Sequence, residues 1–394
     1  MKTPRLCAIC GSSDKRLLYE RRFLSMKEAL VDGYDVVACD RCGFCFADNL
    51  PTQSEFDAYY AEQSKYEDES RPVTLSDWDL RSRPFSVSII ANWLPDKRAK
   101  ILDIGCAAGA LLGELKRQGY ANVKGLDPSP SCCRAAKKLF DIDVSPGTIS
   151  RIPPDIGTFD LVIFGSVLEH ILDLKGALQA VKKLLNPGGC AYIEIPDMSR
   201  CALMNDAPFQ EFSVEHINFF SPISVENLWL AQGFETVGIR QTEIDQIPGL
   251  TLYEVKAMFR KTPAPDTSSF KLDTQARPEI ERYIQKSQHK LERIETVIGA
   301  LADSRKPIIV WGVGTHTQGL LAKSRLKDVN ITAFVDSNTR YTGQQLNGIP
   351  ILPVADLARR SEPILISSQQ FQNEIVAKIR SDLKLPNELI TLYV

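Results

Sequence analysis

The chain has 394 residues, of which 44% are hydrophobic and 24% charged, so it is neither disordered nor fibrous, and its length predicts two or three domains. Lys and Arg total 47 against 49 Asp and Glu, which leaves a net charge of −2 and excludes nucleic acid as the main partner. No apolar stretch approaches the length of a membrane span, and the first residues lack the apolar centre of a signal peptide, so we expect a cytoplasmic protein without a membrane partner.

Cysteines are concentrated near the amino terminus. Cys7 with Cys10, and Cys39 with Cys42, form two C-x-x-C hooks. Each hook places two sulfurs on one side of an ion, and two hooks make the tetrahedral thiolate site that zinc prefers in a structural role. We expect Cys45 to be a small buried residue, because four ligands already close such a site. Reduced thiols without metal, or a redox pair, are the alternatives.

Residues 49–70 combine aromatic and acidic side chains. This composition fits a docking helix or a lid over a ligand, although packing alone is the simpler explanation of its tyrosines. We therefore assign residues 1–70 to a zinc-binding knuckle followed by an aromatic segment.

The next region, residues 71–261, alternates short apolar runs with amphipathic helical stretches. This alternation is typical of an open, mostly parallel sheet of Rossmann-like α/β type. Seven strands are predicted, at 100–104, 123–126, 142–144, 159–164, 190–195, 234–242 and 253–259. The turn at 186–189 is expected to precede the fifth of them.

The first strand–helix turn carries the chemistry of the cofactor site. Asp103 ends the strand, and Gly105 and Gly109 follow in the turn. An acid at this point would repel a pyrophosphate and attract a cationic, amino-acid-like ligand such as S-adenosylmethionine. The glycines allow close approach of the backbone, and Asp127, at the end of the second strand, is placed to accept the ribose hydroxyls.

Four ordered motifs, at 101–109, 125–129, 159–162 and 186–189, resemble those of class I S-adenosylmethionine-dependent methyltransferases. Ala107 departs from the pattern, since family members often carry glycine there, and we expect it to have a negative φ. A Rossmann-like domain with another ligand, or with none, is the alternative.

The resemblance implies a set of cofactor contacts. Asp103 is expected near the methionine amino group, Asp127 on the ribose, and the backbone of Cys106 against the cofactor. The full predicted set is Asp103, Gly105, Cys106, Gly109, Asp127, Pro128, Ser129, Thr148, Ile149, Phe164 and Gly165.

Two Glu-His pairs follow in the same domain, Glu169-His170 and Glu215-His216. Both are expected on the carboxyl-end side of the sheet, where imidazole with a carboxylate neighbour can act as a general base. The stretch around His170 is common to many methyltransferases irrespective of substrate, so lining the substrate pocket and a structural role are equally good readings of it. The segment 215–221 resembles the Glu-His-x-x-x-Phe-Ser segment of nucleotide-sugar C-methyltransferases, in which the histidine is the base.

That resemblance implies a mechanism. His216 would remove the proton beside the carbonyl of a keto-sugar, Glu215 would orient His216, and His170 or a tyrosine would bind the enolate oxygen. Ser213 and Val214 stand where the family has Tyr-His, so Tyr60 or Tyr66 would have to supply the phenol. The alternatives are an O-methyltransferase on a sugar or related polar metabolite, a scaffold without catalysis, and a packing or helix-cap role for His216.

Residues 262–304 form a linker and a long helix with one apolar stripe, which packs on its own chain or, as a minor possibility, makes a homodimer instead of a monomer. Residues 305–394 predict a second, smaller Rossmann-like α/β domain that resembles the carboxyl-terminal domain of sugar C-methyltransferases of polysaccharide pathways. Gly312, Gly314 and Asp336 would there contact a nucleotide-sugar phosphate, or serve only as scaffold. We expect His289 and His316 to be surface or packing residues.

Overall fold

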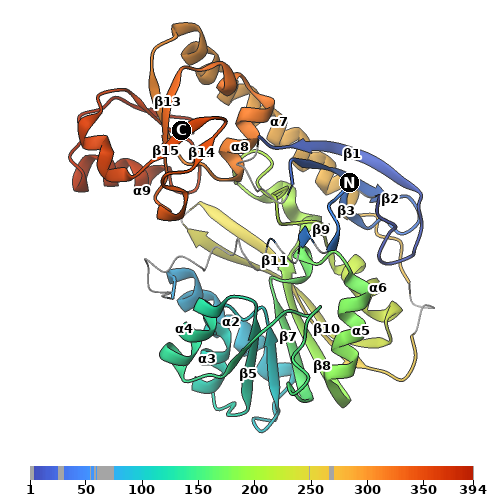
Figure 1. Ribbon diagram of the computed structural model, residues 1–394. Coiled ribbons are helices and arrows are strands. Elements are labelled where there is room, and N and C mark those ends of the chain that lie inside the picture. The colour runs from blue at the N-terminus through green and yellow to red at the C-terminus, as the bar shows by residue number, and fades with distance from the viewer. Residues whose placement is uncertain are drawn as a thin grey trace.

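The computed structural model describes residues 4–24, 31–53, 55, 56, 59, 75–247, 249–265 and 270–393. Tyr60 and Tyr66 lie outside these residues, as does most of the aromatic segment. The described chain contains three sheets, of four, seven and six strands. In Figure 1 the four-stranded sheet near the amino terminus and the carboxyl-terminal domain lie on the same side of the central sheet. None of the helices in the described ranges is both long enough and apolar enough to cross a bilayer.

The central sheet has seven strands, which confirms the predicted Rossmann-like core. Their order is β10-β11-β8-β7-β4-β5-β6, and β11 runs antiparallel to both of its neighbours while β4 to β8 are parallel. The strands are β4 (Ile101–Ile104), β5 (Val123–Asp127), β6 (Val144–Pro146), β7 (Phe159–Gly165), β8 (Leu185–Pro196), β10 (Phe234–Ile247) and β11 (Leu250–Lys261). The predicted turn at 186–189 is part of β8, where the register with β7 breaks between Phe159 and Leu161.

Helices cover both faces of this sheet because its parallel strands are apolar on both faces. Ile101, Leu161 and Ile163 pack with α2 and α3, whereas Leu102, Val162 and Phe164 pack with α5 and α6, as the period of two in a strand requires. Figure 1 shows α2 to α4 on one side and α5 and α6 on the other. The helices are α2 (Asp77–Trp93), α3 (Ala110–Arg117), α4 (Pro130–Phe140), α5 (Leu174–Leu184) and α6 (Pro222–Ala231), with 3₁₀ turns η1 (Leu168–His170) and η2 (Met198–Leu203).

The amino-terminal sheet includes a strand from the central domain. Its order is β1-β2-β3-β9, and β9 belongs to the insert between β8 and β10. Cys45 and Phe46 of β3 pair with Phe219 and Asn218 of β9. The four strands are β1 (Lys15–Arg22), β2 (Gly33–Cys39), β3 (Cys45–Asp48) and β9 (Asn218–Phe219). The knuckle region is therefore joined to the central domain by backbone hydrogen bonds.

The long helix α7 (Ala276–Ser304) uses its apolar stripe within the chain. Its first half, with Ile280, Tyr283 and Ile284, packs on the amino-terminal sheet, and its second half, with Ile294 and Ile298, packs on the carboxyl-terminal domain. The stripe thus supplies core contacts to two domains, as Figure 1 shows for the course of the helix.

The carboxyl-terminal domain contains a six-stranded sheet in the order β14-β15-β13-β12-β16-β17. The pair β14–β15 is antiparallel, and the other neighbouring strands are parallel. The strands are β12 (Ile308–Trp311), β13 (Ile331–Val335), β14 (Gln345–Leu346), β15 (Ile349–Leu352), β16 (Ile364–Ile366) and β17 (Leu389–Thr391). The helices are α8 (Thr315–Lys323) and α9 (Gln372–Ala377), with short turns η3 (Arg325–Asp328), η4 (Thr339–Tyr341), η5 (Val354–Arg359) and η6 (Lys378–Asp382).

The second cysteine hook, Cys39 with Cys42, packs against the segment that leads into α7. Gly43 has a φ of +82°, and a Cβ built on it would lie 2.0 Å from the carbonyl oxygen of Asp273. The Asp273 N–H donates to the carbonyl of Cys42 at 3.0 Å. Gly11, at the corresponding position of the other hook, has a φ of +74° and nothing within 4 Å of such a Cβ. Only the second hook therefore requires glycine for close packing as well as for backbone conformation.

The two glycines provide a matched pair of substitutions. Gly11→Ala is expected to lower the free energy of unfolding by about 1–2 kcal/mol, the cost of a left-handed alanine. Gly43→Ala is expected to lose a further ~1–3 kcal/mol, because Asp273 must move. Urea unfolding followed by intrinsic fluorescence measures both, and equal losses would contradict the packing described for Gly43.

Candidate functional site

A cavity of about 980 Å³ opens at the carboxyl ends of β4, β5 and β7. The turn after β4, the end of β5 and the turn after β7 form one part of its wall, and η1 with residues 211–216 forms another. The start of α2 and the β10–β11 hairpin close its remaining sides. Most of the predicted cofactor residues and both Glu-His pairs therefore meet at one site, although they lie far apart in the chain.

The structure places eight of the eleven predicted cofactor residues in the cavity wall. Gly109, Ser129 and Phe164 have other positions. Gly109 precedes α3, where a Cβ would lie 3.1 Å from that of Ala136, and Ser129 caps α4 by accepting from the Cys132 N–H. Phe164 points into the core on the α5 side of the sheet. The eight that line the cavity are Asp103, Gly105, Cys106, Asp127, Pro128, Thr148, Ile149 and Gly165.

Asp127 holds the first turn in place. Its carboxylate accepts from the Ala107 N–H at 2.8 Å and from the Ser129 N–H at 2.9 Å. The negative φ expected at Ala107 is wrong, because its φ is +47°. The hydrogen bond to Asp127 offsets the cost of about 1–2 kcal/mol that a left-handed alanine carries. An alanine therefore occupies a backbone conformation that usually favours glycine.

Asp103 is buried, with 4% of its surface exposed. Burial raises its pKa to about 8, opposed by the nearby Arg83 guanidinium. Arg83 itself forms ion pairs with Asp79 at 3.2 Å and Glu194 at 3.4 Å. Asp103 is thus mostly protonated at neutral pH, and a cationic group placed beside it would favour its ionised form.

The two histidines lie side by side. The ring centroids of His170 and His216 are 5.0 Å apart with an interplanar angle of 70°. His170 Nδ1 is 3.1 Å from the backbone carbonyl oxygen of Glu215, which joins the first pair to the second. Glu169, His170 and His216 each offer a ligand atom within 4.8 Å of the others. Both predicted pairs therefore belong to one cluster.

The carboxylate that faces His216 belongs to Glu211, which the sequence analysis did not single out. Glu211 Oε2 lies 4.0 Å from His216 Nδ1, whereas Glu215 Oε1 accepts from the Tyr59 hydroxyl at 3.2 Å. The orienting role expected of Glu215 is thus better placed at Glu211. No local motif marks Glu211. Tyr59 was part of the aromatic segment, but the predicted phenols were Tyr60 and Tyr66, which the structure does not describe.

Glu169 and Glu211 are acids without a strong cationic partner. Burial raises the pKa of each to about 8. Among the described residues, none forms a hydrogen bond with the buried Glu169 Oε2, and 2% of the Glu169 surface is exposed. Both carboxyls are close enough to the histidines to exchange protons with them through small movements. The cluster can therefore accept a proton from a bound molecule and donate one to it.

Acidic side chains outnumber basic ones in the cavity wall. Among the described residues that line it, eight are Asp or Glu, and Arg83 stands alone as Lys or Arg. This arrangement favours a cationic ligand together with a neutral, hydroxyl-bearing one, and it disfavours a diphosphate inside the cavity.

The carboxyl-terminal residues predicted to bind substrate belong to a turn of their own domain. Asp336 accepts from the Val313 N–H at 3.0 Å, so Gly312, Gly314 and Asp336 belong to the strand–helix turn of their own domain. None of these three is among the described residues of the cavity wall. The domain instead reaches the site through Gln370, whose amide donates to Gln246 of the wall at 3.2 Å.

The remaining histidines have the positions expected of surface and packing residues. His289 is exposed on α7. His316 Nε2 is 2.7 Å from the Tyr393 hydroxyl, and burial lowers the pKa of His316 to about 3. Neither residue contributes to the wall of the cavity as described.

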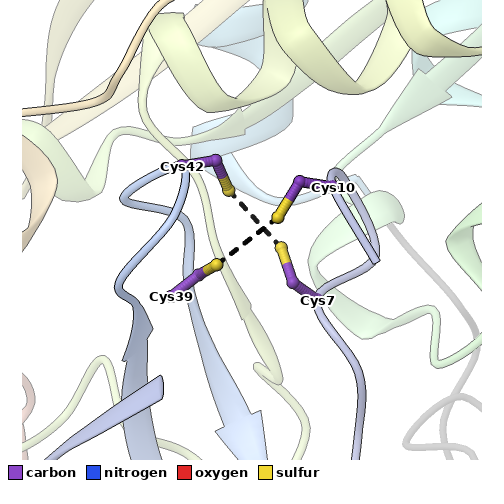
Figure 2. A group of neighbouring side chains, drawn as sticks. All are labelled: Cys7, Cys10, Cys39 and Cys42. Atoms are coloured by element: carbon purple, nitrogen blue, oxygen red, sulfur yellow. Dashed lines mark hydrogen bonds between the residues drawn. The ribbon is translucent and has the colours of Figure 1, made fainter. Parts of the chain in front are cut away.

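The four cysteines of the two hooks converge (Figure 2). Cys7 Sγ lies 3.4 Å from Cys42 Sγ, Cys10 Sγ lies 3.5 Å from Cys39 Sγ, and all four sulfurs are within 4.8 Å of one another. Sulfurs bound to zinc at about 2.3 Å in a tetrahedron stand about 3.8 Å apart, so the tetrad fits such an ion. Cys45 is buried outside this tetrad, and its thiol faces the Gly43 carbonyl.

Two family models match separate parts of the chain. Residues 81–239 match the model described as a methyltransferase domain, and residues 304–391 match the model described as C2185-like, N-terminal.

Curated relatives match the first of these regions. A ubiquinone biosynthesis O-methyltransferase of Methylocella silvestris is 35% identical over 29% of this chain and 48% of its own length. A demethylmenaquinone methyltransferase of Chlorobaculum tepidum is 32% identical over 28% of this chain and 46% of its own. The human mitochondrial ubiquinone biosynthesis O-methyltransferase is 37% identical over 24% of this chain and 28% of its own. The chain thus spans less than half the length of these relatives.

Solved structures similar to this chain include a 1,6-didemethyltoxoflavin-N1-methyltransferase of Burkholderia thailandensis, at 19% identity, with a TM-score of 0.42 over 56% of this chain and 96% of that one. The N-methyltransferase NodS of Bradyrhizobium japonicum has 19% identity and a TM-score of 0.39 over 51% of this chain and 99% of that one. The strand order, the acid-ended first turn and the matched family model lead to one assignment: residues 81–239 form a class I S-adenosylmethionine-dependent methyltransferase domain.

Proposed function

We propose that the protein transfers a methyl group from S-adenosylmethionine to the carbon beside the carbonyl of a keto-sugar. The observation that carries this proposal is the cluster of His170, His216, Glu169 and Glu211 in the same cavity as Asp103 and Asp127. Bound S-adenosylmethionine supplies an electrophilic methyl group. A carbon can accept that group only after a base removes its proton, and the cluster provides such a base.

His216 is the proposed base. With the Nδ1 hydrogen on the Glu211 side, Nε2 is the basic nitrogen and takes the proton from the substrate carbon. The imidazolium that forms is stabilised by the ionised form of Glu211, which becomes favoured once the positive charge is present. In its imidazolium form His170 donates from Nδ1 to the Glu215 carbonyl and from Nε2 to the developing enolate oxygen.

The acidic wall helps to define the substrate. Glu169 Oε2 requires a donor, and the hydroxyl groups of a sugar ring supply one. If the sugar is nucleotide-linked, its ring enters the cavity and its diphosphate stays outside, away from the acidic side chains of the wall.

O-methylation is the second candidate, favoured by the relatives whose names include O-methyltransferase. In that case His216 would remove the proton of a hydroxyl group, with the same partner at Glu211.

The cofactor and the metal are part of the proposal. Asp103 would face the methionine ammonium group, and the Asp127 carboxylate at the end of β5 would accept from the ribose hydroxyls. The tetrad of Cys7, Cys10, Cys39 and Cys42 would hold one structural Zn²⁺, since four thiolates leave no open position for chemistry.

Cofactor binding should release a proton from Asp103. At pH 6.5 the carboxyl with a pKa of about 8 is protonated, and an ammonium partner lowers that pKa, so S-adenosylhomocysteine should release close to one proton. Titration calorimetry in buffers of different ionisation enthalpy measures it. Asp103→Asn, and 5′-methylthioadenosine with the wild type, are controls that should release none. Equal release by both ligands would argue against the contact.

Replacement of His216 should abolish proton removal. In D₂O with S-adenosylhomocysteine present, the wild type should exchange the hydrogen beside the carbonyl of a nucleoside-diphosphate keto-sugar, followed by NMR. His216→Asn should slow this exchange by about 10²–10⁴-fold, the usual share of a general base. His289→Asn, at an exposed position, is the matched control. Methylation without exchange would favour the O-methyl alternative, and full activity of His216→Asn would exclude this base.

Metal content tests the cysteine tetrad. The purified protein should hold one zinc per chain by mass spectrometric metal analysis, and Cys39→Ser should lose it, since three thiolates bind far more weakly. Cys45→Ala should keep the metal because Cys45 lies outside the tetrad. Loss of metal from both variants alike would show that the tetrad is not the site.

A further inference from the structure

Arg5, two residues before the first cysteine of the tetrad, extends its guanidinium toward the base of the histidine cluster. Nη1 donates to the carbonyl oxygens of Ala47 at 2.9 Å and Ile217 at 3.1 Å. Nη2 donates to the carbonyl oxygen of Leu172 at 3.3 Å and to Asn218 Oδ1 at 3.0 Å. The Arg5 side chain thus forms hydrogen bonds with β3, with the segment after His216 and with the segment after His170.

The Asn218 side chain forms further hydrogen bonds to the turn that carries Glu169 and His170. Its amide donates to the carbonyl oxygens of Leu168 at 2.9 Å and Ile171 at 2.7 Å, at the two ends of the turn that carries Glu169 and His170. The N–H of Ile217 also donates to the Glu169 carbonyl at 2.8 Å. The two Glu-His segments are therefore held against each other by hydrogen bonds that converge on Asn218 and Arg5.

The backbone of Arg5 is fixed by the amino-terminal sheet. Its N–H donates to Asp48 Oδ1 at 2.6 Å, and its carbonyl accepts from Lys15 Nζ at 2.8 Å. Lys15 and Asp48 form an ion pair at 2.6 Å. The Arg5 guanidinium lies 5.4 Å from the ring centroid of Phe46. Because Cys7 follows only two residues later, the position of this backbone depends on the hook that holds Cys7 and Cys10.

We propose that Arg5 is a positioning residue through which the cysteine tetrad sets the relative placement of His170 and His216. The cysteine knuckle then contributes to the geometry of the active site in addition to stabilising the fold. A guanidinium can serve four acceptors at once in a fixed plane, whereas an ammonium presents three donors from one point. Lysine at position 5 therefore cannot serve all four acceptors. The catalytic meaning of this placement rests on the proposed function, but the placement itself does not.

The contacts of Arg5 also predict different effects on the histidines and on cofactor affinity. None of the four acceptors of Arg5 belongs to the turn after β4 or to the end of β5, where Asp103 and Asp127 lie. Loss of the Arg5 contacts should disturb the histidines and leave cofactor affinity intact.

Imidazole resonances in NMR spectra provide the test, because the chain has four histidines and two of them serve as internal references. In Arg5→Lys, the His170 and His216 signals, assigned with His→Asn variants, should shift, while those of His289 and His316 stay in place. Affinity for S-adenosylhomocysteine should stay within twofold, and methyl transfer should fall at least tenfold. Arg22→Lys is the matched control, since Arg22 lies in the same sheet and bonds only to Arg21, Tyr34, Asp35 and Glu20 in the contacts described.

Removal of the metal tests whether the cysteine tetrad affects His170 and His216 through Arg5. A chelator should shift the same two signals in the wild type, and added Zn²⁺ should restore them there but leave the Arg5→Lys spectrum shifted. If Arg5→Lys does not fold, Asn218→Asp replaces it: this variant keeps an acceptor for Arg5, loses the donors to Leu168 and Ile171, and should produce the same pattern.

Unchanged His170 and His216 signals in folded Arg5→Lys or Asn218→Asp, or in metal-free wild type, would overturn the proposal. Shifted signals in a protein that methylates no keto-sugar would instead support the positioning role and count against the proposed function.

Discussion

The pairing of β3 with β9 is the constraint on which the arrangement of the site depends. The strand β9 (Asn218–Phe219) is encoded in the insert of the methyltransferase domain but completes the amino-terminal sheet. Residues 211–216, immediately before it, must therefore follow the edge of that sheet, and this course places His216 beside His170. A two-residue strand makes few hydrogen bonds of its own. The buried Asn218 side chain and the Arg5 guanidinium supply the further bonds that hold it in register.

Burial of acidic groups decides the chemistry of the cavity. A chain with a net charge of −2 shows no obvious preference for charged ligands, yet the wall of the cavity at the carboxyl ends of β4, β5 and β7 holds mostly acidic charged side chains. Burial raises the pKa of Asp103, Glu169 and Glu211 to about 8 each, so the protonated forms of these acids are favoured at neutral pH. A cationic cofactor and a hydroxyl-bearing substrate would satisfy these groups, which is why local electrostatics support the proposed reaction better than global charge does.

Motifs that act within a few residues were predictable. The acid at the end of β4 and the acid at the end of β5 take the positions that their spacing indicates, because a strand followed by a tight turn leaves little freedom. A short motif can also carry more than one role. Gly109, Ser129 and Phe164 belong to the same motifs, but helix packing, helix capping and the alternation of a strand turn them away from the cavity.

The sequence by itself determined the α/β alternation, the seven strands of the central sheet, the cofactor turn and the convergence of two cysteine hooks, because each depends on local spacing or on period. The tertiary structure decided which groups meet: Glu211 instead of Glu215 at His216, Tyr59 at Glu215, and Arg5 beneath both histidine segments. These contacts join residues that are distant in the chain or that share no motif. Their meeting follows from how β9 docks on β3, a long-range pairing that leaves no periodic signal in the amino-acid order.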